Sequence, residues 1–155
     1  MSRAELDDID RKIIARLAND ARVSNRKIAL ELGLAEGTIR SRIKRLLETR
    51  AMRITAVTNM NQRRSPVLAL LWIEVDKAGE IATVAEQLKS IREITFVATL
   101  CGRADILAMT FVADAADLAR FMRERIDPIP HIHRVAYGIG QDVVKEDYRW
   151  CPIVG

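Results

Sequence analysis

Cysteine is scarce in this chain, with Cys101 and Cys151 the only two among 155 residues. Two cysteines so far apart provide neither a disulfide framework nor the ligands of a structural zinc site. Aromatic residues make up 5% of the chain, and seven glycines and four prolines are too few for a collagen-like or low-complexity sequence. No stretch has the roughly 18 consecutive apolar residues of a membrane span, and the charged N-terminus lacks the apolar segment of a secretory signal. These absences predict a globular protein in the reducing cytoplasm.

Motifs of catalysis are also absent. The chain contains no GxSxG or HExxH motif, no glycine-rich phosphate loop and no obvious pair of nucleophile and base. His131 and His133 are two residues apart on a predicted strand and share a face, but no third metal ligand is near. We therefore expect no enzyme, no bound metal and no cofactor.

The net charge of +4 is unevenly distributed. Residues 1–65 hold 15 Lys and Arg against 8 Asp and Glu, a balance of +7, whereas residues 66–155 hold 10 against 13, a balance of −3. Opposite signs indicate two parts with different roles, of which the first faces a polyanion.

The first 58 residues have the pattern of three helices. Asp7 is a good cap for the first helix, Ser24 caps the second, and the third runs over about residues 36–49. Ala29, Gly33 and Ile39 fall where a helix-turn-helix needs a small, a turn and a buried apolar residue. The alternative is an ordinary helical hairpin with a solvated basic face. Alternation over residues 52–60 predicts a strand that braces the helices, as in a winged helix.

After a polar linker at residues 59–65, the spacing of apolar residues along the chain changes. Apolar and β-branched runs predict strands over residues 67–75, 94–100, 106–112 and 132–144. Amphipathic spacing predicts helices over residues 81–91 and 114–126. The order over residues 66–155 is therefore β-α-β-β-α-β, a ferredoxin-like domain, and the whole chain belongs to the α+β class.

Both faces of the predicted sheet are apolar, although two helices cover only one of them. Leu70 and Trp72 point opposite to Leu71. An open apolar face of this size favours aggregation in a monomer, so we expect a second copy of the chain to cover it. The alternative is that the N-terminal helices fold back onto this face.

Three motifs make the chain resemble the Lrp/AsnC family of transcriptional regulators. They are LDDIDRKIIARLANDAR at residues 6–22, SNRKIALELGL with GTIRSRIKRLLE at residues 24–48, and CGRADIL at residues 101–107. The resemblance implies an N-terminal DNA-binding domain at residues 1–58 and a C-terminal domain that dimerises across its sheet. It also implies assembly into tetramers, octamers or larger oligomers, with an amino acid or related small molecule bound where dimers meet.

By resemblance, the third helix enters the major groove of double-stranded DNA. The residues implied near base edges are Gly37, Thr38, Arg40, Ser41 and Arg42, and those on phosphates are Lys44, Arg45 and Arg50. Ser24 and Asn25 are implied to meet the DNA backbone. Ala35 replaces the serine that members often have at the start of this helix, which loses a cap of about 1 kcal/mol.

The resemblance also implies an effector site around the turn between two strands, formed by Thr99, Cys101, Gly102, Arg103 and Asp105. Gly102 permits close approach of a ligand carboxylate, and Asp105 has the charge to pair with an ammonium group. The alternative is a tight β-turn with no ligand.

The leading hypothesis is thus a sequence-specific, DNA-binding transcriptional regulator that senses an amino acid. Two alternatives remain: a small-molecule-sensing regulatory subunit of a metabolic enzyme, which leaves the basic half unexplained, and a ligand-independent architectural DNA-binding protein.

Overall fold

The structure, a computed structural model, describes residues 5–58, 67–141, 143–145, 147, 149 and 153. The chain divides into two compact units, one built on residues 1–57 and the other on residues 58–145. The predicted linker at residues 59–65 lies outside the described residues, so the predicted domain limits stay a prediction.

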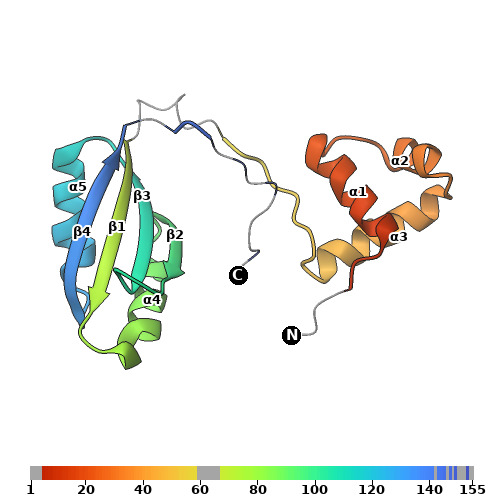
Figure 1. Cartoon of the computed structure of the whole chain (residues 1–155). Helices are drawn as coiled ribbons and strands as arrows, with labels where there is room; N and C mark the ends of the chain where they lie inside the picture. Colours follow the sequence, from red (N-terminus) through yellow and green to blue (C-terminus); the bar gives the residue numbers. More distant parts are fainter. Residues whose placement is uncertain are drawn as a thin grey trace. The chain divides into compact units, whose positions relative to one another are not determined.

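The first unit consists of three helices, α1 (Asp8–Asn19), α2 (Asn25–Leu32) and α3 (Glu36–Glu48) (Figure 1). Apolar residues spaced three or four apart on each helix meet in one core. The buried members of this core are Ile13, Leu17, Ile28, Ala29, Ile39 and Leu46.

The turn between α2 and α3 has the predicted helix-turn-helix geometry. Gly33 ends α2 in the left-handed conformation, with φ 66° and ψ 35°. Ala29 is nearly buried, which allows α3 to approach α2, and Ile39 is fully buried between them. The expected roles of these three residues are confirmed.

The predicted strand over residues 52–60 is not found in its described part. Residues 52–58 have no regular secondary structure, and 53–58 are exposed. Alternation of apolar residues is insufficient for a strand, because a strand also requires a neighbour to complete its hydrogen-bond ladder. Residues 59 and 60 lie outside the described residues.

The second unit confirms the predicted β-α-β-β-α-β order and the α+β class. Its elements are β1 (Val67–Val75), a short 3₁₀ turn η2 (Ala78–Glu80), α4 (Ile81–Ser90), β2 (Ile94–Thr99), β3 (Ile106–Val112), α5 (Ala115–Phe121), a π-helical turn η3 (Met122–Ile126) and β4 (Ile132–Gly140). The four strands are antiparallel in the order β2-β3-β1-β4 (Figure 1).

The last strand is shorter than predicted, since it ends at Gly140 rather than near residue 144. Gly140 pairs with Leu68, the second residue of β1. Among the described residues of β1, only Val67 lies beyond that pairing.

One face of the sheet carries the helices. Ala69, Leu71 and Ile73 of β1 are fully buried there, packed in one cluster with Val84 of α4 and Leu118 of α5. This cluster is the core of the second unit.

The opposite side of the sheet, named here the open face, carries neither α4 nor α5. Leu68 pairs with Phe111, Leu70 with Met109 and Trp72 with Leu107, so these side chains share the open face. All six are half-buried, whereas alternate residues of the same strands are buried.

Candidate nucleic-acid interface

The outer side of α3 gathers most residues predicted to contact DNA. α3 packs Ile39, Ile43 and Leu46 against α1 and α2, so the residues on its opposite side face away from the core. The exposed members of the predicted set on α3 are Gly37, Thr38, Arg40, Ser41, Lys44 and Arg45, while Arg42 is half-buried.

Three further predicted residues lie at helix ends. The Ser24 hydroxyl accepts a hydrogen bond from the Lys27 backbone N–H at 3.2 Å and so caps α2, and Asn25 is the first residue of that helix. Arg50 is exposed just after α3, with a positive φ of 55°. The start of α3 lacks a side-chain cap at Ala35, as predicted.

Two cations on the outer side of α3 have carboxylate partners one turn away. Arg40 Nη2 lies 2.8 Å from Glu36 Oε1, and Lys44 Nζ lies 3.7 Å from Glu48 Oε1. Exposed pairs at this spacing contribute only about 0.3–0.5 kcal/mol. Arg40 and Lys44 can therefore exchange these carboxylates for a DNA phosphate at small cost.

The start of α1 carries an acidic capping box formed by Asp7 and Asp10. The Asp7 carboxylate accepts from the Asp10 backbone N–H at 2.8 Å, and the Asp10 carboxylate accepts from the Asp7 backbone N–H at 3.3 Å. Each side chain thus satisfies a backbone donor that the helix leaves unpaired.

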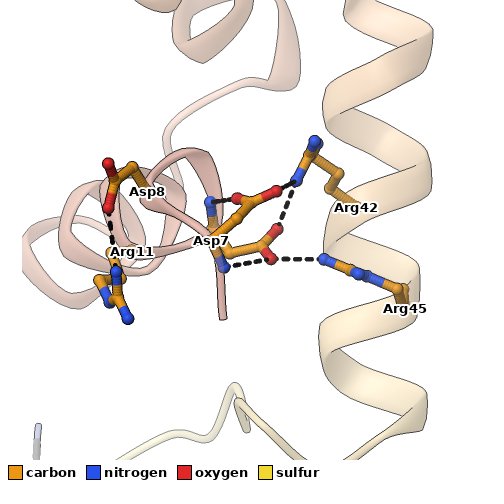
Figure 2. Close-up of polar contacts among 6 residues, drawn as sticks. Asp7, Asp8, Arg11, Arg42 and Arg45 are labelled. Carbon is orange, nitrogen blue, oxygen red and sulfur yellow. Dashed lines mark hydrogen bonds and ion pairs between the residues drawn. The ribbon is translucent and has the colours of Figure 1, made fainter. Parts of the chain in front are cut away.

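These carboxylates also bind two arginines of α3 (Figure 2). Arg42 Nη1 lies 2.6 Å from Asp7 Oδ2 and 2.9 Å from Asp10 Oδ1, and Arg45 Nη2 contacts Asp10 Oδ2. Asp7, Asp10, Arg42 and Arg45 are named here the clamp. It joins the first turn of α1 to the middle of α3.

The clamp shifts the titration of two of its members. The backbone hydrogen bond from Asp10, followed by the hydrogen bond from Arg42, lowers the pKa of Asp7 below its usual range. Hydrogen bonds to Asp7 and then Asp10 raise the pKa of Arg42. Both effects favour the charged forms, so the ion pair persists at neutral pH.

The clamp borders a shallow hollow on the outer side of α3. Its lining consists of Asp7, Gly37, Thr38, Ser41, Arg42 and Arg45. Five of the ten residues predicted to contact DNA therefore border one concave surface.

Sequence reasoning gave Asp10 no role. A signal was present, because Asp10 precedes Ile13 by three residues and Leu17 by seven, which places it on the buried stripe of α1. A carboxylate on a buried stripe requires a cationic partner, and that requirement points to the arginines of the neighbouring helix.

The turn predicted to bind an effector lies between β2 and β3. Gly102 has φ 146°, a value that favours glycine, and Cys101 and Arg103 are exposed. The Asp105 carboxylate accepts a hydrogen bond from the Val75 backbone N–H at 2.8 Å, and the Asp105 N–H donates to the Ile73 carbonyl at 3.0 Å. Asp105 therefore already ties this turn to the end of β1.

His131 and His133 are both exposed, and His133 Nδ1 lies 3.4 Å from Asp76 Oδ1. Among the described residues, no group of three or more His, Cys, Asp or Glu side chains is placed to hold a metal. In the same part of the chain, no helix is long and apolar enough to cross a bilayer.

Two family models match the chain. Residues 6–47 match the AsnC-type helix-turn-helix domain, and residues 63–153 match the PF0864 C-terminal dimeric alpha+beta barrel domain. The two matches fall on the two structural units and leave few residues outside.

Two transcriptional regulators resemble this chain over most of its length. The HTH-type transcriptional regulator FL11 of Pyrococcus furiosus is 39% identical over 121 residues, which cover 77% of this chain and 80% of that protein. The HTH-type transcriptional regulator Ptr1 of Methanocaldococcus jannaschii is 33% identical over 129 residues, covering 83% and 86%.

Solved structures agree in fold. The E. coli AsnC structure has a TM-score of 0.83 at 19% identity and covers 92% of this chain and 96% of its own. PF0864 of Pyrococcus furiosus, an AsnC family member, is 28% identical with a TM-score of 0.69, covering 94% and 95%. The chain therefore belongs to the AsnC family of transcriptional regulators with a DNA-binding helix-turn-helix domain.

Proposed function

We propose that the chain is a sequence-specific regulator that reads DNA through the outer side of α3 and works as a dimer or larger homo-oligomer. The exposed row of hydroxyls and cations over Gly37 to Lys44, held on a rigid helix-turn-helix, is the observation that supports it most. A helix of this kind fits the major groove, where side chains meet base edges.

The proposed contacts divide by chemistry. Thr38, Arg40 and Ser41 have the donors and acceptors that discriminate bases, and Gly37 permits close approach of the backbone. Lys44 and Arg50 are proposed on phosphates, and Ser24 and Asn25 on the DNA backbone. Arg42 and Arg45 belong to the clamp, which limits their freedom.

The experiment is equilibrium binding of the full chain to fragments recovered from a random-sequence DNA pool. We expect the binding constant to fall steeply with salt, because each phosphate contact releases counterions. Arg40→Ala should change the recovered sequence at one position. An affinity that does not vary with salt would contradict DNA binding.

We further propose that the turn at Thr99, Cys101, Gly102, Arg103 and Asp105 binds an amino acid or related metabolite. The φ of Gly102 and the exposure of its neighbours support this site. A thermal-shift screen of the amino acids tests it, since a ligand at 100 times its dissociation constant stabilises the folded protein by about 2.7 kcal/mol.

One observation favours a second candidate, a DNA-binding protein without an effector. The Asp105 carboxylate already accepts the Val75 N–H, as expected of a turn that has only a structural role. In that case no amino acid raises the melting temperature, while DNA binding is retained.

A further inference from the structure

Asp10 is the one fully buried carboxylate among the described residues, with 0% of its surface exposed. Its oxygens accept hydrogen bonds from Arg42 Nη1 at 2.9 Å, from Arg45 Nη2 and from the Asp7 backbone N–H at 3.3 Å. All the bonds that satisfy this buried charge therefore come from the clamp.

The burial of Asp10 restricts what Arg42 can do. If the Arg42 guanidinium turned toward a DNA phosphate, the buried Asp10 carboxylate would have one cationic partner fewer. Breaking a buried ion pair by removing one partner is strongly destabilising, in contrast to breaking an exposed pair. Arg42 is thus less able to leave its carboxylates than Arg40 or Lys44.

Side-chain exposure also separates Arg42 from Arg40 and Lys44. The Arg42 side chain is 25% exposed, compared with 71% for Arg40 and 75% for Lys44. Arg42 also contacts two carboxylates at once, whereas Arg40 and Lys44 each have one exposed partner on their own helix.

The charges of the clamp sum to zero, because two carboxylates face two guanidiniums. A phosphate that approached Arg42 would meet the negative Asp7 and Asp10 at close range. The clamp therefore offers a DNA phosphate much less attraction than two free arginines would.

We propose that Asp10 is a positioning residue for DNA recognition. It ties Arg42 and Arg45 to α1 and thereby fixes the angle at which α3 presents Thr38 and Ser41. Arg42 braces the helix and carries no phosphate contact, while Arg45, 52% exposed, keeps part of its guanidinium available. The proposal rests on the proposed DNA binding and assigns a role within it.

The test compares the salt dependence of DNA binding for full-length variants, using selected and scrambled fragments at about 50 to 200 mM salt. Lys44→Gln should make the slope of log affinity against log salt concentration shallower by about 0.9, since it removes one phosphate contact. Arg42→Gln should lower the affinity for the selected fragment and leave the slope at the wild-type value. A slope that also becomes shallower in Arg42→Gln overturns the proposal.

Asp10→Asn should change the salt dependence of binding in the opposite direction to Lys44→Gln. The substitution frees Arg45 from its carboxylate in the clamp and leaves Arg42 with Asp7 alone. It should therefore raise the affinity for scrambled DNA, steepen the slope of log affinity against log salt and lower the ratio of selected to scrambled binding. A purely structural role of Asp10 would instead weaken binding to both fragments, and that result overturns the proposal.

Circular dichroism shows whether Asp10→Asn folds. If it does not, the salt dependence of Arg42→Gln tests the proposal by itself. Arg42→Gln should fold, because Asp10 keeps its ion pair with Arg45. If wild-type protein shows no salt-dependent binding, the proposed function itself fails and the role of Asp10 fails with it. If wild type binds but the slopes contradict expectation, only the positioning role fails.

Discussion

Asp7 combines two functions in one side chain. One carboxylate oxygen caps α1 through the Asp10 N–H, and the other binds Arg42 of α3 at 2.6 Å. Both interactions favour the ionised form, which is why the pKa of Asp7 in the folded protein lies below its usual value. A depressed pKa makes a residue a source of pH-dependent stability.

Asp7→Asn tests this linkage. An asparagine still caps a helix, so the substitution removes mainly the charge. Ionised Asp7 stabilises the fold above its unfolded pKa of about 3.9, and this contribution is lost as the pH falls through the lower folded pKa. We expect wild type to be more stable than Asp7→Asn at pH 7 by urea denaturation, with a difference that shrinks below about pH 4.

The matched control for Asp7→Asn is the same comparison in an Arg42→Gln background. With its cationic partner removed, Asp7 should show a smaller difference at pH 7. A difference that stays constant between pH 7 and pH 3 would show that the charge of Asp7 does not stabilise the fold.

At the start of α3, a substitution of Ala35 can add a helix cap that the protein lacks. No side chain caps this helix, and the backbone of Ala35 is already extended, as a cap requires. Ala35→Ser should raise the free energy of unfolding by about 1 kcal/mol, measured by urea denaturation. Ser24→Ala, which removes the existing cap of α2, should lower it by a similar amount.

At the scale of elements, the sequence was sufficient where local rules and packing agree. Gly33 ends α2 because glycine adopts the left-handed conformation without strain, and the 3.6-residue period of Ile39 and Leu46 orients α3. The β-α-β-β-α-β order of elements follows from β-branched apolar runs and amphipathic helical spacing. Each of these signals lies within a few residues of the feature it predicts.

The sequence was insufficient where the outcome depends on distant or missing partners. The segment 52–58 alternates like a strand but pairs with no strand of the described chain. The clamp joins residues 32 to 35 positions apart, which no local pattern reveals. The π-helical turn Met122–Ile126 continues α5 with the same apolar spacing, so periodicity predicts one uninterrupted helix.

A close contact between β4 and β1 gives a prediction for the sheet. A Cβ atom built on Gly138 would lie 3.1 Å from Cζ3 of Trp72 on the open face. Gly138→Val should therefore displace the indole and destabilise the fold by about 1–3 kcal/mol in urea denaturation. Gly79→Ala is the control, because nothing lies within 4 Å of its added atom; equal stability of the two variants would contradict this packing.

At the scale of the whole molecule, the open face is the strongest indication of self-association. It carries Leu68, Leu70, Trp72, Leu107, Met109 and Phe111 side by side and half-exposed, in a domain whose family description is dimeric. Contiguous apolar surface of this kind is characteristic of a homodimer interface.

A charge on the open face should prevent this association. We expect analytical ultracentrifugation to give at least twice the 17.5 kDa chain mass for wild type and one chain mass for Leu70→Glu. Ala116→Glu, an exposed position on α5 away from the open face, should remain associated. A monomeric wild-type protein would contradict dimerisation.

Association matters for DNA reading because one helix-turn-helix contacts few bases. If two copies join through their second units as proposed, they would bind two half-sites as one event, which raises affinity without any new contact. In the proposed assembly, the clamp would fix α3 relative to α1 within each copy, and the open face would join the copies.

The most direct measurement is the affinity of the full chain for selected DNA that carries one or two half-sites, determined over a salt series. We expect tighter binding to two half-sites one helical turn apart, about 10 base pairs, and a negative slope of log affinity against log salt. Equal affinity for selected and scrambled DNA, or an affinity independent of salt, would contradict this expectation.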